Sequence, residues 1–402
     1  MSQASLSPST ILPVAFGGLL SLTAAMGIGR FVYTPILPFM VHDAGLTPAE
    51  GGLIASANFL AYMVGALAAA SGRLTQFLPG DRRAIFLAAL ALSAATTAAM
   101  GLFDSVAAFV VIRALSGIAS AYVLVFASAL VLDRISAAGR PGLVALHFAG
   151  VGLGIALSAL MVAALARSGA DWRMLWYASG LVSALAFLAC TRLIEKTEDP
   201  PHAQARASGP ADRRLVALYV SYGLFGFGYV ITTTFISTMA RMSPALSPYE
   251  TAIWAAVGIA GMPSVMIWGT LARRIGNAPT YAIACLVEAL GVTLSVISDT
   301  GLIVVLAAMM VGGTFIAITA IGLMQARLLS RGNAHSALAL MTASFGFGQM
   351  VGPTLAGLAY DATGSFLLPS LAAAAALVIA AGLALTPATR RRETGNAAPE
   401  RE

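Results

Sequence analysis

Two arginines stand inside long apolar stretches of this sequence. Arg30 lies about ten residues before the end of the first stretch and Arg113 about nine residues into the fourth, so both lie near the middle of an apolar layer about 30 Å thick. A guanidinium at that depth needs a partner, and no Asp or Glu stands at the same level in the first six stretches. Because the planar Arg fork matches a carboxylate, the pattern predicts a bound anion.

Uncharged polar residues accompany the arginines at a similar depth. Tyr229 and Asn58 can donate or accept hydrogen bonds there, and Tyr33 and Thr34 lie close after the first arginine. A structural role is the alternative for either arginine, and for Arg113 this role would be hydrogen bonding to backbone carbonyls at a helix junction. As the leading interpretation, we expect a substrate-binding layer formed by Arg30, Arg113, Tyr229, Asn58, Tyr33 and Thr34.

Three further ionisable residues are candidates for coupling or gating. His147 lies in the fifth apolar stretch and could carry protons near neutral pH, while Glu288 is the acid that lies deepest within a stretch. Asp133 precedes Arg134 at the end of the fourth stretch. Each also has a structural interpretation: a packed core histidine, a protonated or hydrogen-bonded carboxyl between helices, and an ion pair at a helix end.

Motifs for catalysis, nucleotide binding and metal binding are missing from the sequence. There is no G-x-x-x-x-G-K-[ST] loop and no H-E-x-x-H pair. Cys190 and Cys285 both fall within apolar stretches, where a thiolate metal site is not expected. We therefore predict a protein that is not an enzyme and that holds neither a metal nor a cofactor.

The composition is typical of a membrane protein. Hydrophobic residues make up 58% of the chain and charged residues 10%, with a mean hydropathy of +0.85, whereas about 25% of a soluble domain is charged. The net charge of +6 does not indicate nucleic-acid binding, because the basic residues are spread over short loops. The apolar stretches, each about 20 residues or longer, predict twelve transmembrane helices at 12–40, 49–72, 84–103, 106–132, 142–166, 172–194, 215–240, 250–272, 278–298, 301–326, 335–360 and 366–387.

The twelve stretches fall into two sets of six. The long polar segment 195–214 is rich in Pro, Ala and mixed charge, and it predicts a cytoplasmic linker between an N-terminal bundle at 1–194 and a C-terminal bundle with a short tail at 215–402. Of the 23 Lys and Arg residues, eighteen lie in loops and tails on one side and three in loops on the other. By the positive-inside rule we expect both termini to be cytoplasmic, and we expect the membrane to be a bacterial inner membrane.

The two halves carry a weak internal repeat. The segment 27–30 (GIGR) matches 226–229 (GFGY) at a spacing of 199 residues, and 150–154 matches 344–348 at a spacing of 194. Internal repetition about a midplane site is typical of secondary transporters. Small residues allow helices to approach closely, so we expect helix packing at Gly152, Gly154, Gly346 and Gly348.

These motifs resemble those of the major facilitator superfamily over nearly the whole chain. Arg113 and Gly117 form an Arg-x-x-x-Gly pattern, 171–173 (DWR) opens the sixth stretch, and 27–38 (GIGRFVYTPILP) resembles the signature of a bacterial branch. The resemblance implies two six-helix bundles, with the first, fourth, seventh and tenth helices lining a central cavity. The loop after the second stretch departs from the family's spacing, and the fifth stretch lacks a Gly-Pro pair, so drug–proton antiport is less expected.

These observations predict a secondary active transporter of a small solute that works by alternating access, and the arginines favour a small organic anion. The partners expected are this substrate, the lipid bilayer and protons, with no nucleic acid, and the protein is expected to be a monomer. Export of neutral or amphipathic compounds, as in drug efflux, is the main alternative. A membrane receptor that binds its ligand without transport is a third interpretation.

Overall fold

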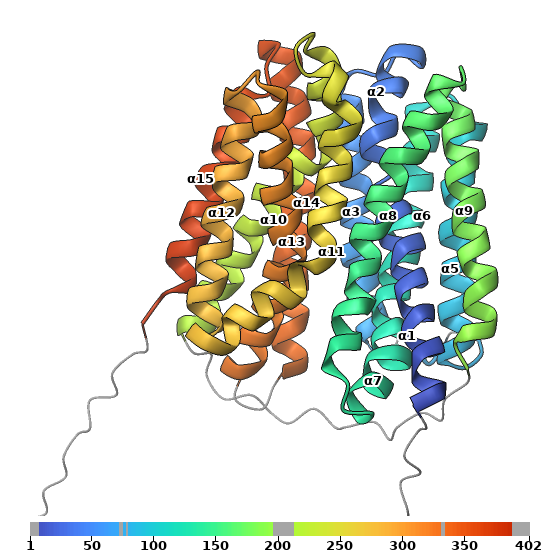
Figure 1. The fold of residues 1–402 in the computed structure, drawn as a ribbon, viewed down its shortest axis with the longest axis vertical. Coiled ribbons are helices and arrows are strands. Elements are labelled where there is room, and N and C mark those ends of the chain that lie inside the picture. The colour runs from blue at the N-terminus through green and yellow to red at the C-terminus, as the bar shows by residue number, and fades with distance from the viewer. Residues whose placement is uncertain (1–7, 72–74, 78, 196–212, 331–333, 388–402) are drawn as a thin grey trace, which may run out of the picture.

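The structure is a computed structural model that describes residues 8–71, 75–77, 79–195, 213–330 and 334–387, and within them the regular structure is helical (Figure 1). Within the part of the chain that the structure describes, eleven helical segments are long and apolar enough to cross a membrane, and α14 adds a segment of 30 residues. The all-α membrane fold is confirmed. The main helices are α1 (Pro8–Leu22), α2 (Tyr33–Asp43), α3 (Pro48–Ala70), α5 (Arg82–Ala99), α6 (Val106–Ala127), α7 (Asp133–Ala137), α8 (Pro141–Arg167), α9 (Trp172–Leu193), α10 (Arg213–Met242), α11 (Glu250–Ile275), α12 (Asn277–Ile297), α13 (Gly301–Leu329), α14 (Ala334–Thr363) and α15 (Leu367–Ala384).

The helices pack as two six-helix bundles that lie side by side (Figure 1). In the first, α6 packs on α3 and α5, and α8 packs on α1; in the second, α10 packs on α14 and α15, and α13 on α12. Among the described residues the main contacts between the bundles are those of α3 with α14, α8 with α11 and α2 with α10, and we call the region where the two bundles meet the bundle interface. We call the end where α1 begins and α15 ends the terminal end, and the opposite end the far end.

Local capping determines where several helices begin. Thr47 and Glu50 form a capping box at the start of α3. Asp81, Ser105 and Asp171 each accept a hydrogen bond from the backbone N–H three residues later, which starts α5, α6 and α9. The aspartate of the DWR motif therefore has a capping role.

The first transmembrane segment is interrupted near its middle. Between α1 and α2 the backbone forms a π-helical turn, η1 (Thr23–Ile28), and then a turn at 29–32. Pro35 has no N–H to donate to the Phe31 carbonyl, and the Thr34 N–H takes that acceptor at 3.2 Å. The Arg30 carbonyl consequently loses Thr34, its usual helical donor.

The four packing glycines lie in two kinds of contact. A Cβ added at Gly152 would lie 2.5 Å from the Gly258 carbonyl oxygen of α11, and one at Gly346 would lie 2.5 Å from a side-chain carbon of α3, so both lie at the bundle interface. Gly154 packs instead against η1 in the first bundle, and Gly348 packs against α10 in the second. Two of the four glycines therefore contact the other bundle, and two hold their own bundle together.

Candidate functional site

Arg113 caps the open turn of the first segment. It lies on α6, is buried, and donates hydrogen bonds from Nη1 to the Gly29 carbonyl at 2.7 Å and from Nη2 to the Arg30 carbonyl at 3.0 Å. Backbone acceptors inside a membrane need such donors because water is not available there. In this conformation the two terminal nitrogens of Arg113, which were expected to hold a carboxylate, bond backbone carbonyls instead. This is the geometry of the alternative structural role.

Arg30 is surrounded by aromatic rings rather than by acids. The carbon at the centre of its guanidinium, Cζ, lies 4.0 Å from the ring centroid of Tyr62, 5.0 Å from that of Phe59 and 5.8 Å from that of Phe31. Tyr62 is also in hydrogen-bond contact with the guanidinium. The residue is 4% exposed, and among the described residues its Nε and Nη2 have no hydrogen-bond partner and no Asp or Glu forms an ion pair with it. Two buried donors are therefore available to a ligand.

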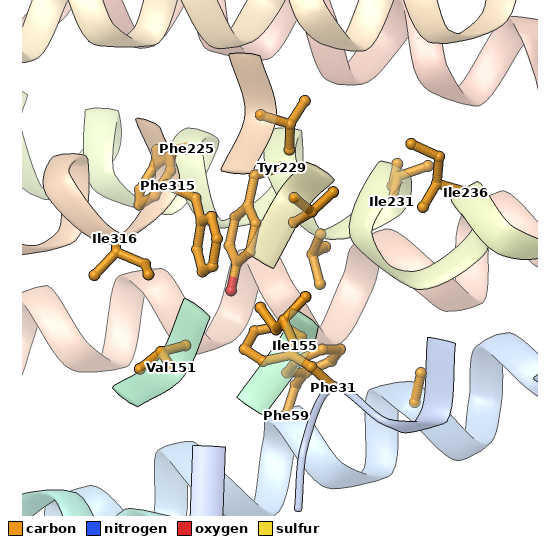
Figure 2. Close-up of a cluster of buried hydrophobic side chains, with 14 of the residues drawn as sticks. Phe31, Phe59, Val151, Ile155, Phe225, Tyr229, Ile231, Ile236, Phe315 and Ile316 are labelled. Atoms are coloured by element: carbon orange, nitrogen blue, oxygen red, sulfur yellow. The ribbon is translucent and has the colours of Figure 1, made fainter. Parts of the chain in front are cut away.

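Tyr229 lies opposite this arginine in the second bundle. Its hydroxyl accepts a hydrogen bond from Nε2 of Gln349 and points toward the first bundle, where Phe31 and Ile155 lie (Figure 2). The Arg30 guanidinium is near enough for its charge to act on this hydroxyl. Because Gln349 supplies the donor in that bond, the O–H of Tyr229 remains able to donate to an acceptor.

The other three predicted ligands use polar groups in contacts between helices. Asn58 donates from Nδ2 to the Arg113 carbonyl at 2.8 Å, and its buried Oδ1 has no partner among the described residues. The Tyr33 hydroxyl donates to a carbonyl of α3 at 2.8 Å, and Thr34 donates to the Thr233 carbonyl at 2.6 Å across the bundle interface. The structure thus places Asn58 beside the arginines and gives Tyr33 and Thr34 partners in the backbone of neighbouring helices.

The three coupling candidates lie apart from one another. His147 of α8 is fully buried against α1, where a Cβ added at Gly18 would lie 2.5 Å from its Nδ1. Asp133 is exposed at the start of α7. Glu288 of α12 is fully buried in the second bundle, within electrostatic range of Tyr229. Of the three, Glu288 is the one that lies near Tyr229.

Sequence reasoning missed Gln349 and the aromatic residues around the site. The signal was present as helical spacing: Phe225 and Tyr229 are four residues apart on α10, and Phe345 and Gln349 are four apart on α14. Residues four apart share one face of a helix. Such spacing is equally common in packed cores, so it did not single these residues out.

Comparisons with known proteins identify the relatives of this chain. Residues 22–385 match the sequence model of the family described as "Uncharacterised MFS-type transporter YbfB". A mutant of the nucleoside transporter NupG has the same fold with a TM-score of 0.73, at 15% identity over 93% of this chain and 98% of that one. A bacterial homolog of the human lysosomal transporter Spinster, in an inward-facing and unoccupied conformation, gives a TM-score of 0.68 at 16% identity over 94% and 97% of the two chains. No curated protein matches the sequence.

Proposed function

The chain belongs to this family of MFS-type transporters, those of the major facilitator superfamily, and on that premise we propose that it carries a small organic anion across a bacterial inner membrane by alternating access. Both the family and the similar structures are transporters rather than enzymes. In the proposal the bundles at 1–194 and 215–402 rock against each other around a site at mid-depth.

The observation that carries the proposal is the state of Arg30. A buried guanidinium without an acid partner is unfavourable in a membrane protein, since cation–π contacts compensate for lost hydration only in part. An anion would pair with the charge and accept hydrogen bonds from its two free donors. Tyr229 could donate a further hydrogen bond from the opposite bundle, so the ligand would contact both bundles at once.

In this proposal Arg113 has a positioning role rather than a contact with substrate. Its hydrogen bonds to the carbonyls of Gly29 and Arg30 fix the turn that carries the Arg30 side chain. Its own charge also lies close to Arg30 and makes the layer more electropositive. The two arginines would thus have different roles: Arg113 holds the turn, and Arg30 on that turn binds the anion.

Contacts at the bundle interface support a conformation that is closed at the far end. Thr34 bonds to the Thr233 carbonyl there, and Nε1 of Trp254 donates to the Ser158 hydroxyl at 3.0 Å. If the terminal end is cytoplasmic, as the distribution of Lys and Arg predicts, this is the state closed to the outside. Binding and release would then alternate with the breaking of these contacts.

The test compares charged ligands with uncharged ligands of the same shape. The melting temperature of the purified protein in detergent is measured with pyruvate, isobutyrate, benzoate and cyclohexanecarboxylate, and with the amide of each acid. A ligand that binds the folded state raises its stability. We expect at least one carboxylate, and not its amide, to raise the melting temperature, and the same anion to undergo counterflow in proteoliposomes.

Variants of Arg30 provide the decisive comparison. Arg30→Gln should abolish the response to the anion, and Arg30→Lys should weaken it, because an ammonium lacks the planar fork. Arg167→Gln serves as the control, since Arg167 is exposed at the end of α8. Equal responses to acids and amides, or an unchanged response in Arg30→Gln, would favour export of neutral or amphipathic compounds instead.

A further inference from the structure

An aromatic cluster lines the second bundle where it faces Arg30. The ring of Tyr229 lies 5.5 Å from that of Phe315, with an interplanar angle of 8°, and 5.8 Å from that of Phe345, with an angle of 6°. Phe225 stacks on both Tyr229, at 5.2 Å, and Phe345, at 5.4 Å. These four residues, Tyr229, Phe315, Phe345 and Phe225, form what we call the aromatic platform, and three helices of one bundle contribute to it.

The platform reaches across the bundle interface to the arginine. Phe31 of the first bundle contacts Phe315 edge-on, with centroids 5.8 Å apart, and the same Phe31 lies 5.8 Å from the Arg30 guanidinium carbon. Figure 2 shows Phe31 and Phe59 on the side of the cluster toward which the Tyr229 hydroxyl points. The Arg30 guanidinium, with its two free donors, therefore lies on the first-bundle side of the Phe31–Phe315 contact, and the aromatic platform lies on the second-bundle side.

Two observations distinguish this cluster from an ordinary packed core. Its edge carries buried polar atoms that have no partner among the described residues, Nε and Nη2 of Arg30 and Oε1 of Gln349. Buried polar atoms are normally paired, so the two Arg30 nitrogens are donors that an anionic ligand could satisfy. In addition, the Phe31–Phe315 contact spans the two bundles. Movement of the bundles would separate these rings and expose their surfaces to a ligand.

We propose that the anion carried by this protein is an aromatic carboxylate, with its carboxylate on Arg30 and its planar ring against Phe315 and Tyr229. The inference rests on the proposed function and adds the chemical class of the substrate. The ring would take the place of Phe31 in the T-shaped contact with Phe315 once the bundles separate. Edge-on and offset contacts between rings are favourable beyond the burial of their area, which should amount to about a three- to tenfold gain in affinity.

The test uses ligands that share charge and size but differ in the π face. Benzoate and cyclohexanecarboxylate are both ionised at neutral pH and present a six-membered ring, which is flat and aromatic only in benzoate. Their dissociation constants for the purified protein are measured by titration calorimetry in detergent, with benzamide as the uncharged control. We expect benzoate to bind about three- to tenfold more tightly than cyclohexanecarboxylate, and benzamide to bind least.

Variants of the platform connect this preference to named rings. Phe315→Leu keeps an apolar side chain but removes the π face against the ligand, and Phe345→Leu removes the ring that stacks on Tyr229, so each should reduce the ratio of the two affinities toward one. Phe366→Leu is the matched control, because Phe366 packs on Phe235 at 4.7 Å in the same bundle, away from the platform. It should leave the ratio unchanged, and comparing the two ligands within one variant cancels any general loss of folded protein.

The outcomes separate this inference from the function on which it rests. If cyclohexanecarboxylate or the short aliphatic acids bind as tightly as benzoate, in an Arg30-dependent way, the protein is an anion transporter and the aromatic assignment is wrong. If no carboxylate binds more tightly than its amide, both proposals fail. If benzoate is preferred but the preference survives both Phe315→Leu and Phe345→Leu, the ring site lies elsewhere and this assignment is overturned.

Discussion

Thr34 donates a 2.6 Å hydrogen bond to the backbone carbonyl of Thr233, the residue that stands 199 positions later in the chain. That spacing is the one that relates the 27–30 segment to 226–229, so the two threonines occupy equivalent positions of the internal repeat. They meet where α2 and α10 pack together. The duplicated halves therefore touch through the same structural element, as expected for two related bundles that face each other.

Arg241 reinforces the contact at this end of the interface. It lies in the last turn of α10, pairs with Glu250 of α11 at 2.8 Å, and its guanidinium carbon lies 3.5 Å from the ring centroid of Phe39 on α2. A cation–π contact of a partly buried arginine adds to the hydrogen bond of Thr34. Together these contacts give the far end of the interface its polar connections.

Removing the Thr34 hydroxyl should loosen the far end. Thr34→Val keeps the shape but deletes a bond worth about 1 kcal/mol, which would change the ratio of closed to open states about fivefold. Spin labels at the exposed Gly45 and Ser247 should show a larger population of long distances in electron-spin resonance. Thr232→Val is the matched control, since the Thr232 hydroxyl has no partner among the described residues. An equal effect of both variants would refute this role.

The two arginines should differ in what they do for stability. Arg113→Met leaves the buried Arg30 carbonyl without its side-chain donor and the Gly29 carbonyl with only the Ser116 hydroxyl at 3.2 Å, and we expect it to lower the free energy of unfolding by about 2 kcal/mol or more. Arg30→Met removes a buried cation that lacks an acid partner, so stability should stay the same or rise. Unfolding in detergent micelles measures both. Equal destabilisation by the two substitutions would contradict this division of roles.

Substitutions at two neighbouring glycines of α8 should affect different properties, one the rate of transport and the other the stability. Gly152→Ala places a Cβ 2.5 Å from the Gly258 carbonyl oxygen across the interface, so it should slow counterflow while the melting temperature changes little. Gly154→Ala places a Cβ 2.5 Å from the Thr23 carbonyl oxygen inside the first bundle, and it should lower the melting temperature instead. A lower melting temperature for Gly152→Ala than for Gly154→Ala would show that their contacts had been assigned the wrong way round.

Topology can be tested with two exposed serines in a background without Cys190 and Cys285. Ser168→Cys follows α8 at the far end and should react with an impermeant thiol reagent added to whole cells. Ser136→Cys lies on α7 at the terminal end and should react only after the membrane is broken. Labelling of Ser136→Cys in intact cells would reverse the proposed orientation.

The sequence by itself determined the membrane class and the helical segments, and it predicted the depth of the two arginines. The reason is that lipid offers no hydrogen bonds, so each long apolar stretch must form a helix that satisfies its own backbone, and its length fixes where a residue lies. The break in the first segment could also be anticipated at Pro35, because proline cannot donate to the carbonyl four residues earlier. These properties depend on neighbours in the chain, which the sequence displays directly.

Only the tertiary structure decided which arginine bonds the backbone and which keeps hydrogen-bond donors without a partner among the described residues. The carbonyls of Gly29 and Arg30 meet Arg113 from 84 and 83 residues away, and the rings around Tyr229 come from helices 86 and 116 residues further along the chain. At equal depth and with equal charge, the two guanidinium groups differ only in what packs against them. That depends on how α6 crosses the broken segment and how α13 and α14 face α10, and helical periodicity alone does not specify these contacts between distant segments.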